Sequence, residues 1–384
     1  MTQVTDTTTD SAVQALIQLR IRQDVQSMHA YAIQDSKGFV KLDAMENPHR
    51  LPLELQEALG KRLGALAFNR YPDGRVNDLR QALATFADMP EGFDIMLGNG
   101  SDELISLLAM ACDVPVQPGA AKPAILAPLP GFVMYAMSAA LQGLDFIGVP
   151  LTADFALDVT AMVHAIETRQ PAIIYLAYPN NPTANLWDEA DMARVVAAGA
   201  AAGSLVVIDE AYQPFSSRTY LDVIRANPAQ NAHVLLMRTM SKFGLAGVRL
   251  GYMMGPAALI AQVDKVRPPY NISVLNYECA LFALEHQEVF AAQAREICAQ
   301  RAMLLEALRA LPGVKAWDSD ANMVLVRILG EGERAQKVFD GLKAHGVLVK
   351  NVSKMHPLLA QCLRLTVGTA AENAQLLKAL QEIL

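Results

Sequence analysis

The residues with the clearest chemical potential are a lysine and an aspartate that each follow an apolar run. Lys242 lies in the segment 238–249, and Asp209 ends the apolar run at residues 204–208. A lysine amine can attack an aldehyde, and a carboxylate can keep a ring nitrogen protonated. Taken alone, such a lysine is most often an exposed surface residue, and such a carboxylate can simply cap a helix. Their interpretation therefore depends on the residues around them.

A glycine-rich turn supplies candidate contacts for a phosphate group. It follows a short strand expected at residues 94–97, precedes a helical pattern, and contains Gly100, Ser101 and Asp102. Backbone N–H groups at the start of a helix suit an anion. Additional hydroxyl and guanidinium donors could come from Thr239, Ser241 and Arg249. The turn is not a dinucleotide fingerprint, because position 103 is Glu, and it lacks the lysine of a P-loop.

Three more side chains could contact a planar ring. Tyr212 and Asn181 could donate hydrogen bonds to a ring oxygen, and Phe132 could stack on the ring face. Each also has an ordinary explanation: Asn-Asn-Pro is a common turn sequence, and Phe132 could be a core aromatic. Together with the lysine, the aspartate and the turn, however, they predict a site for pyridoxal 5'-phosphate. Lys242 would form the Schiff base, and Asp209 would keep the pyridine nitrogen protonated.

Composition limits the class of protein. The chain has 384 residues, of which 52% are hydrophobic and 18% charged, and its net charge is −7. This composition predicts a folded protein with two domains and argues against a nucleic-acid binder, which normally carries a basic face. The four cysteines are scattered, so neither a metal site nor a disulfide framework is expected. The polar start of the chain and the absence of a long apolar run predict a cytoplasmic protein that does not bind membranes.

Apolar runs and helical patterns alternate through the middle of the chain. Strands are expected at residues 94–97, 124–127, 145–149, 172–176, 205–208 and 234–237. This order predicts an α/β fold with a mostly parallel central sheet and helices on both faces. Ser101 or Asp102 is expected to cap the helix 103–112. Because ligand sites gather at the carboxyl ends of parallel strands, the candidate residues should meet there.

The pattern changes on both sides of this region. We expect a disordered tail at residues 1–10, an arm at 11–40 that joins the small domain, and a large cofactor-binding domain at 41–268. The pattern of residues 269–384 predicts a small α+β domain that starts with one long helix at 274–310. Strands are expected at 314–317, 322–326, 347–350 and 363–367, with helices at 332–344 and 371–384.

The motifs together resemble a known family. Residues 100–103, 178–183, 209–212, 241–242 and 247–251 resemble the fold-type I, pyridoxal-phosphate-dependent aminotransferases. Residues 46–48, 70–72, 321–323 and 362–369 resemble blocks of the histidinol-phosphate aminotransferases within them. Three substitutions depart from the usual pattern: Phe132 replaces a tyrosine, Ala184 a glycine and Lys350 an arginine. The segment from Lys242 to Arg249 is also one residue shorter.

The resemblance implies a reaction and a set of substrate contacts. L-Histidinol phosphate and 2-oxoglutarate would give imidazole acetol phosphate and glutamate, a step of histidine biosynthesis. Arg364 would pair with the substrate phosphate or with the carboxylate of glutamate, and Tyr31, Asn181 and Lys350 are further candidates for substrate contacts. The resemblance also implies a homodimer with shared active sites, in which Tyr71 reaches the partner's cofactor phosphate.

Two alternative functions would use the same cofactor, and a third belongs to another class of protein. An aromatic amino-acid aminotransferase or a decarboxylase of phosphorylated amino acids would use the same fold, and a comparison of amine donors separates them. A pyridoxal-phosphate-binding regulatory domain without enzymatic activity should carry a DNA-binding domain and a basic face. The chain has neither the length nor the charge for these.

Overall fold

A computed structural model describes residues 7–28, 35–72, 75–115 and 118–384. The chain divides into two compact units, residues 1–37 and residues 38–384. The first unit contains α1 (Thr7–Arg20) and α2 (Gln23–Ser27), which are joined by a hydrogen bond from Gln26 Nε2 to the carbonyl oxygen of Ile17. Helix α1 therefore begins inside the segment predicted to be a disordered tail. Tyr31 lies outside the described residues.

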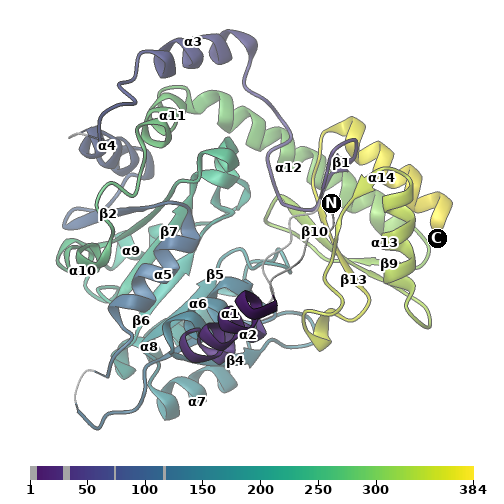
Figure 1. Ribbon diagram of the computed structural model, residues 1–384. Helices are drawn as coiled ribbons and strands as arrows, with labels where there is room; N and C mark the ends of the chain where they lie inside the picture. Colours follow the sequence, from purple (N-terminus) through teal and green to yellow (C-terminus); the bar gives the residue numbers. More distant parts are fainter. Residues whose placement is uncertain (1–6, 29–34, 73–74, 116–117) are drawn as a thin grey trace. The chain divides into compact units, whose positions relative to one another are not determined.

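A seven-stranded sheet forms the centre of the second unit (Figure 1). All neighbouring pairs in it are parallel except those that involve β8, which is antiparallel to both of its neighbours. In spatial order the strands are β2 (Phe93–Gly98), β8 (Gly251–Pro256), β7 (Val234–Thr239), β6 (Leu205–Asp209), β5 (Ile173–Ala177), β3 (Ala124–Leu129) and β4 (Asp145–Pro150). The six predicted strands and the mostly parallel α/β sheet are confirmed.

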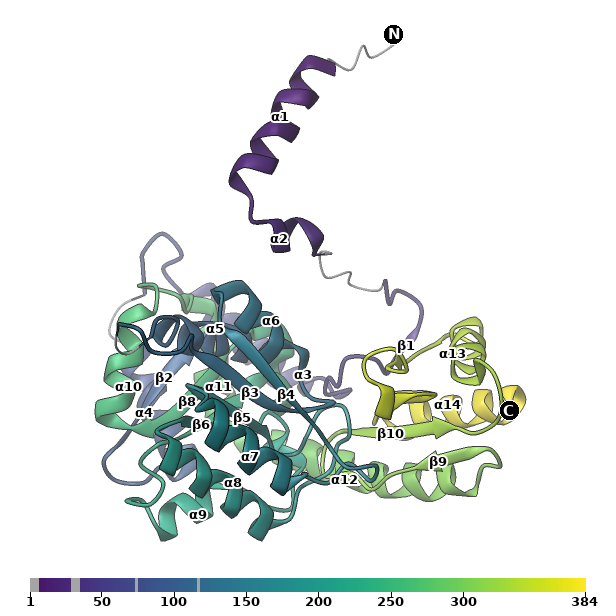
Figure 2. The same cartoon turned by 90° about the horizontal axis from the view of Figure 1, so that it is seen from below.

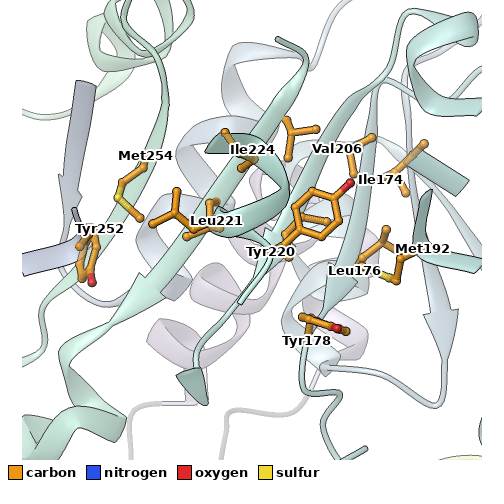
Figure 3. Packing of buried hydrophobic residues seen from close by; sticks show 14 of the residues in the cluster. Ile174, Leu176, Tyr178, Met192, Val206, Tyr220, Leu221, Ile224, Tyr252 and Met254 are labelled. Carbon is orange, nitrogen blue, oxygen red and sulfur yellow. The ribbon is translucent and has the colours of Figure 1, made fainter. Parts of the chain in front are cut away.

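The sheet buries both of its faces, as parallel strands usually do. Alternate side chains separate into two clusters, with Ile174 and Val206 on one face and Tyr175 and Val207 on the other. Figure 3 shows part of the first cluster, including Ile174 and Val206. The helices on that face are α4 (Arg75–Ala87), α7 (Val159–Arg169), α8 (Glu189–Ala202), α9 (Leu221–Ala226) and α11 (Val274–Glu285). The opposite face is covered by α5 (Ser101–Ala111), α6 (Val133–Gln142) and α10 (Ala257–Val263).

A second, four-stranded antiparallel sheet forms in the C-terminal third (Figure 2). Its order is β12 (Lys350–Asn351), β13 (Cys362–Thr366), β10 (Met323–Ile328) and β9 (Val314–Ala316). A short parallel pair joins β1 (Val40–Lys41) to β11 (Val347–Leu348). The remaining helices are α3 (Leu53–Gly64), which packs against α11, and α12 (Gln287–Ala310), α13 (Arg334–Ala344) and α14 (Ala370–Ile383), which pack around the small sheet.

Three local expectations were wrong or incomplete. The helix predicted at residues 274–310 is interrupted at His286, so that α11 and α12 are separate helices. The strand predicted at 347–350 is divided between β11 and β12, which pair with different strands. Strand β8 was not predicted, because its short apolar centre is bounded by Gly251 and Gly255. Within the described residues, no helix combines the length and apolar character needed to cross a bilayer.

Candidate active site

A cavity of about 320 Å³ lies at the carboxyl edge of the large sheet. The carboxyl ends of β5, β6 and β7 open onto it, together with the start of α5 and the segment that follows β1. Ten predicted site residues line it: Ser101, Asp102, Phe132, Asn181, Asp209, Tyr212, Thr239, Ser241, Lys242 and Arg249. The sequence prediction missed the other side of the cavity, where Ala44, Met45 and Glu46 complete the wall.

Lys242 follows β7 on the short helical segment η2 (Ser241–Leu245) and directs its amine into the cavity. Its Nζ donates a hydrogen bond to the carbonyl oxygen of Ala44 at 3.1 Å. Burial, followed by the nearby positive charge of Arg364, lowers the pKa of Lys242 from 10.5 to about 7, although Glu46 opposes the shift. A substantial fraction of this amine is therefore neutral at neutral pH and can act as a base or nucleophile.

Asp209 ends β6, and its side chain is almost completely buried. Its Oδ2 accepts a hydrogen bond from Tyr135 Oη at 2.6 Å, and its Oδ1 accepts one from the backbone N–H of Ala211 at 3.0 Å. Burial raises the pKa of Asp209 to about 6, while these two hydrogen bonds oppose the increase. Asp209 can therefore present a negative charge to a cationic ring nitrogen at neutral pH. Tyr135 was not among the predicted site residues.

The glycine-rich turn forms a cradle around the start of α5. Gly100 is the N-cap residue of this helix and has a φ of 82°, and no side chain caps the helix. The expectation that Ser101 or Asp102 caps it was therefore wrong: both lie inside the first turn, and the helix N–H groups remain available to an anion. A Cβ atom on Gly100 would lie 2.6 Å from Nη2 of Arg249. The close approach of this guanidinium thus requires glycine.

Hydroxyl groups complete the cradle. The hydroxyl of Thr239 donates to the hydroxyl of Ser241 at 3.1 Å, and Nη1 of Arg249 donates to the same Ser241 oxygen at 3.4 Å. Nη2 of Arg249 lies 3.5 Å from a carboxylate oxygen of Asp102. A guanidinium, two hydroxyls and an open helix N-terminus form a donor set that fits a phosphate dianion.

Arg364 approaches the cavity from the small sheet. It lies on β13 with 9% of its surface exposed, and it donates from Nη1 to Asn181 Oδ1 at 2.8 Å and from Nη2 to the carbonyl oxygen of Asp43 at 2.9 Å. This contact leaves the amide N–H₂ group of Asn181 for a ligand. Lys350 on β12 pairs directly with Arg364, so both side chains leave the sheet on one face. Neither cation is among the residues that line the cavity wall.

The loops around Phe132 are fixed to each other. Asn180 Nδ2 donates to the carbonyl oxygen of Pro130 at 3.1 Å and to the hydroxyl of Thr183 at 2.7 Å, which joins the loop after β5 to the loop after β3. The ring of Phe132 can therefore hold its place at the cavity wall. Ala184 has a φ of 65°, a conformation that favours glycine, and this explains why glycine is usual at that position.

Tyr71 does not contribute to the cavity of its own chain. Its side chain is 78% exposed, and its ring stacks on that of Tyr270 with the centroids 4.7 Å apart. Among the described residues, no group of three or more His, Cys, Asp and Glu side chains is arranged to hold a metal ion.

Comparisons with known proteins identify the family. A family model described as "Aminotransferase class I and II" matches residues 37–380. The chain belongs to this family. It is 69% identical over 375 residues to the histidinol-phosphate aminotransferase of Polaromonas naphthalenivorans. This match covers 98% of this chain and 99% of that protein. It is 66% identical to the histidinol-phosphate aminotransferase of Paracidovorax citrulli, with coverage of 94% and 96%.

A solved structure agrees with these relatives. The crystal structure of histidinol-phosphate aminotransferase from Sinorhizobium meliloti in complex with pyridoxal 5'-phosphate has a TM-score of 0.79 and is 25% identical in sequence. The match covers 95% of this chain and 97% of that one. The resemblance stated from the sequence motifs is therefore confirmed, and so is the fold class.

The cradle leads to a first prediction. Gly100→Ala should weaken binding of the predicted pyridoxal phosphate by about tenfold or more, because the new Cβ displaces the Arg249 guanidinium from the anion. Cofactor affinity and thermal stability are measured together. Gly92→Ala is the matched control, because Gly92 has a similar φ of 80° but no atom within 4 Å of an added Cβ. Equal losses of affinity in both variants would mean that backbone strain, not the guanidinium contact, is responsible.

Proposed function

We propose that this aminotransferase transfers the amino group of L-histidinol phosphate to 2-oxoglutarate, giving imidazole acetol phosphate and glutamate in histidine biosynthesis. One observation carries the proposal: the amine of Lys242, with its lowered pKa, faces a cavity that contains the phosphate cradle and Asn181, whose side-chain oxygen accepts a hydrogen bond from Arg364. The near-complete coverage by histidinol-phosphate aminotransferases that are 66% and 69% identical supports the choice of substrate.

The proposed cofactor is pyridoxal 5'-phosphate, and the residues present fit it. When bound, it supplies an aldehyde that condenses with amines and a ring that withdraws electrons from the neighbouring carbon. The helix start at Gly100 and Ser101, with Thr239, Ser241 and Arg249, would hold its phosphate. Asp209 would pair with the ring nitrogen, Phe132 would lie against the ring face, and Tyr212 and Asn181 would donate to the ring oxygen.

Lys242 would act on the proton that moves during the reaction. Its amine is partly neutral near pH 7, so it can accept a proton from the carbon that bears the substrate amine and return a proton later. The positive charge of Arg364 contributes to this neutrality, since a second cation disfavours the protonated amine. The substrate-binding group and the base are thus electrostatically coupled.

Arg364 would hold the anionic end of both substrates in turn. A phosphate monoester and the distal carboxylate of glutamate must use the same pocket, and the planar guanidinium can bind either through two hydrogen bonds. Lys350, its cross-strand neighbour, would add a second positive charge. Because an ammonium has no planar fork, we expect Lys350 to contribute charge more than orientation.

The proposed working unit is a homodimer in which Tyr71 completes the partner's site. The exposure of Tyr71, its stacking on Tyr270 and its position outside its own cavity support this arrangement. Its hydroxyl would donate to the cofactor phosphate across the interface. The alternatives for the reaction remain an aromatic amino-acid aminotransferase and a phospho-amino-acid decarboxylase.

A comparison of amine donors tests the substrate. With 2-oxoglutarate as acceptor, the purified protein should use histidinol phosphate with a far higher kcat/KM than phenylalanine, tyrosine or aspartate. Histidinol, which lacks the phosphate, is the matched donor. Equal efficiency with histidinol and histidinol phosphate would contradict phosphate recognition and favour the aromatic aminotransferase. Release of carbon dioxide from a phosphorylated amino acid would favour the decarboxylase.

A second prediction concerns the amine of Lys242. Borohydride reduction of the cofactor-loaded protein should fix the cofactor to Lys242, which peptide mapping detects. In the cofactor-free protein, the reactivity of Lys242 towards an amine reagent should rise through about pH 7, since the amine is protonated below that pH and neutral above it. Ordinary lysines titrate near pH 10.4 and serve as internal controls. Label on a different lysine would reject this assignment.

The shared anion site gives a third prediction. Arg364→Lys should lower kcat/KM for both half-reactions by roughly ten- to a hundredfold, because both anions lose the bidentate contact. Arg327→Lys is a suitable control, since Arg327 lies on the same small sheet but donates to the carbonyl oxygens of Leu358 and Ala360. A loss confined to one half-reaction would mean that separate groups bind the two substrates.

Hybrid dimers provide the fourth test. Lys242→Ala and Tyr71→Phe chains should each form impaired homodimers. In a hybrid, one site would combine an intact Lys242 with an intact Tyr71 from the other chain, so activity should return at about half of the sites. Verified hybrids that regain no activity would assign Tyr71 to its own subunit's site or to no site.

A further inference from the structure

Tyr135 makes a buried contact that neither the sequence motifs nor the proposed reaction uses. It lies in the first turn of α6 with 2% of its surface exposed. Its hydroxyl donates to Oδ2 of Asp209 at 2.6 Å, across 74 residues of sequence. Such a short hydrogen bond to a carboxylate is among the stronger polar contacts in a protein.

The ring of Tyr135 is held from two directions. It stacks on Tyr175 of β5 with the centroids 4.3 Å apart and an interplanar angle of 10°. The ring of Phe132, the N-cap residue of α6, meets it edge-on at 5.6 Å. The hydroxyl therefore has little freedom to leave Asp209. The start of α6 therefore positions both Phe132, which lines the cavity, and Tyr135, which binds the carboxylate of Asp209.

Asp209 has few other favourable partners. In the part of the chain that the structure describes, Tyr135 is the side chain that donates to it, and Ala211 contributes a backbone N–H. The charged groups that act on it are Asp102 from α5 and Glu210 from its own segment, and both disfavour its negative charge. The phenols of Tyr175 and Tyr212 also interact electrostatically with Asp209, and the basic side chains of Lys242 and Arg249 line the same cavity.

We propose that Tyr135 is a positioning residue for the cofactor: its hydroxyl fixes the carboxylate of Asp209 at the cavity edge and stabilises its negative charge. The proposal rests on the proposed use of pyridoxal phosphate, whose ring nitrogen Asp209 would face. A hydrogen bond to the ionised form of an acid favours that form. Without the hydroxyl, Asp209 remains buried beside two carboxylates and becomes protonated more readily.

Tyr135→Phe isolates this effect, because it keeps both ring contacts and removes the hydroxyl alone. The cofactor-free variant should bind pyridoxal phosphate about tenfold more weakly at neutral pH, as loss of a hydrogen bond to a charged group implies. The pH below which affinity declines should also move upwards from its wild-type value. The affinity and the pH below which it declines are both obtained by titrating the protein with pyridoxal phosphate at a series of pH values, with no substrate present.

Tyr175→Phe is the matched control. The Tyr175 hydroxyl is equally buried, has no hydrogen-bond partner among the described residues, and belongs to the ring that stacks on Tyr135. Its removal should leave the affinity and its pH dependence close to those of the wild type. An equal change in both phenylalanine variants would mean that the loss of either buried hydroxyl, and not the loss of the contact with Asp209, weakens binding, and would overturn the proposal.

A double-variant cycle tests whether Tyr135 acts through Asp209. In an Asp209→Asn background, Tyr135→Phe should cause little further loss of affinity, because the charge that it stabilises is gone. An undiminished second loss would overturn the proposal, as would wild-type behaviour of the single variant. If the cofactor-free Tyr135→Phe protein is unstable, the rate of cofactor release from the loaded protein replaces the titration and should be faster than for Tyr175→Phe.

These outcomes are separate from those of the proposed function. A wild-type protein that bound no pyridoxal phosphate would reject the cofactor itself. A protein that bound it but ignored histidinol phosphate would reject the substrate and leave the Tyr135 measurements intact.

Discussion

A short stretch of backbone, residues 43–45, connects the two cations of the site. Arg364 from the small sheet donates to the carbonyl oxygen of Asp43, and Lys242 from the large sheet donates to the carbonyl oxygen of Ala44. Two positive groups that would repel each other are thus held by neighbouring carbonyl dipoles. The position of this segment therefore fixes where the Lys242 amine and the Arg364 guanidinium lie relative to each other.

The same segment is held under local strain. Met45 has a φ of 51°, a conformation that costs a side-chain-bearing residue roughly 1–2 kcal/mol. Thr366 Oγ1 accepts the Met45 N–H at 3.0 Å, and Asn322 Nδ2 donates to the Met45 carbonyl oxygen at 3.0 Å. These two hydrogen bonds, one with the last residue of β13 and one with the residue before β10, therefore offset the strain and hold the segment in place. Strained backbone of this kind is common at active sites.

The sequence predicted the residues at strand ends well and the contacts between distant segments poorly. Asp209 and Lys242 follow apolar runs, so the geometry of a parallel sheet brings them together without further information. Residues 43–45 follow a two-residue strand, and their partners lie about 200 to 320 residues away in sequence. No hydrophobic periodicity in the sequence identifies such a segment. Tyr135 is similar, because an aromatic residue in a buried helix looks like ordinary core until its hydroxyl is seen to reach Asp209.

The electrostatics of the cavity link substrate binding to base strength. The charge of Arg364 helps to keep the pKa of Lys242 low, so that part of the amine is neutral near pH 7. An anion paired with Arg364 cancels part of that charge and removes part of the cause of the low pKa. In the proposed function, the amine would then become a stronger base when a phosphate or carboxylate pairs with Arg364. In the proposed reaction, substrate binding by Arg364 would therefore increase the basicity of the lysine that moves the proton.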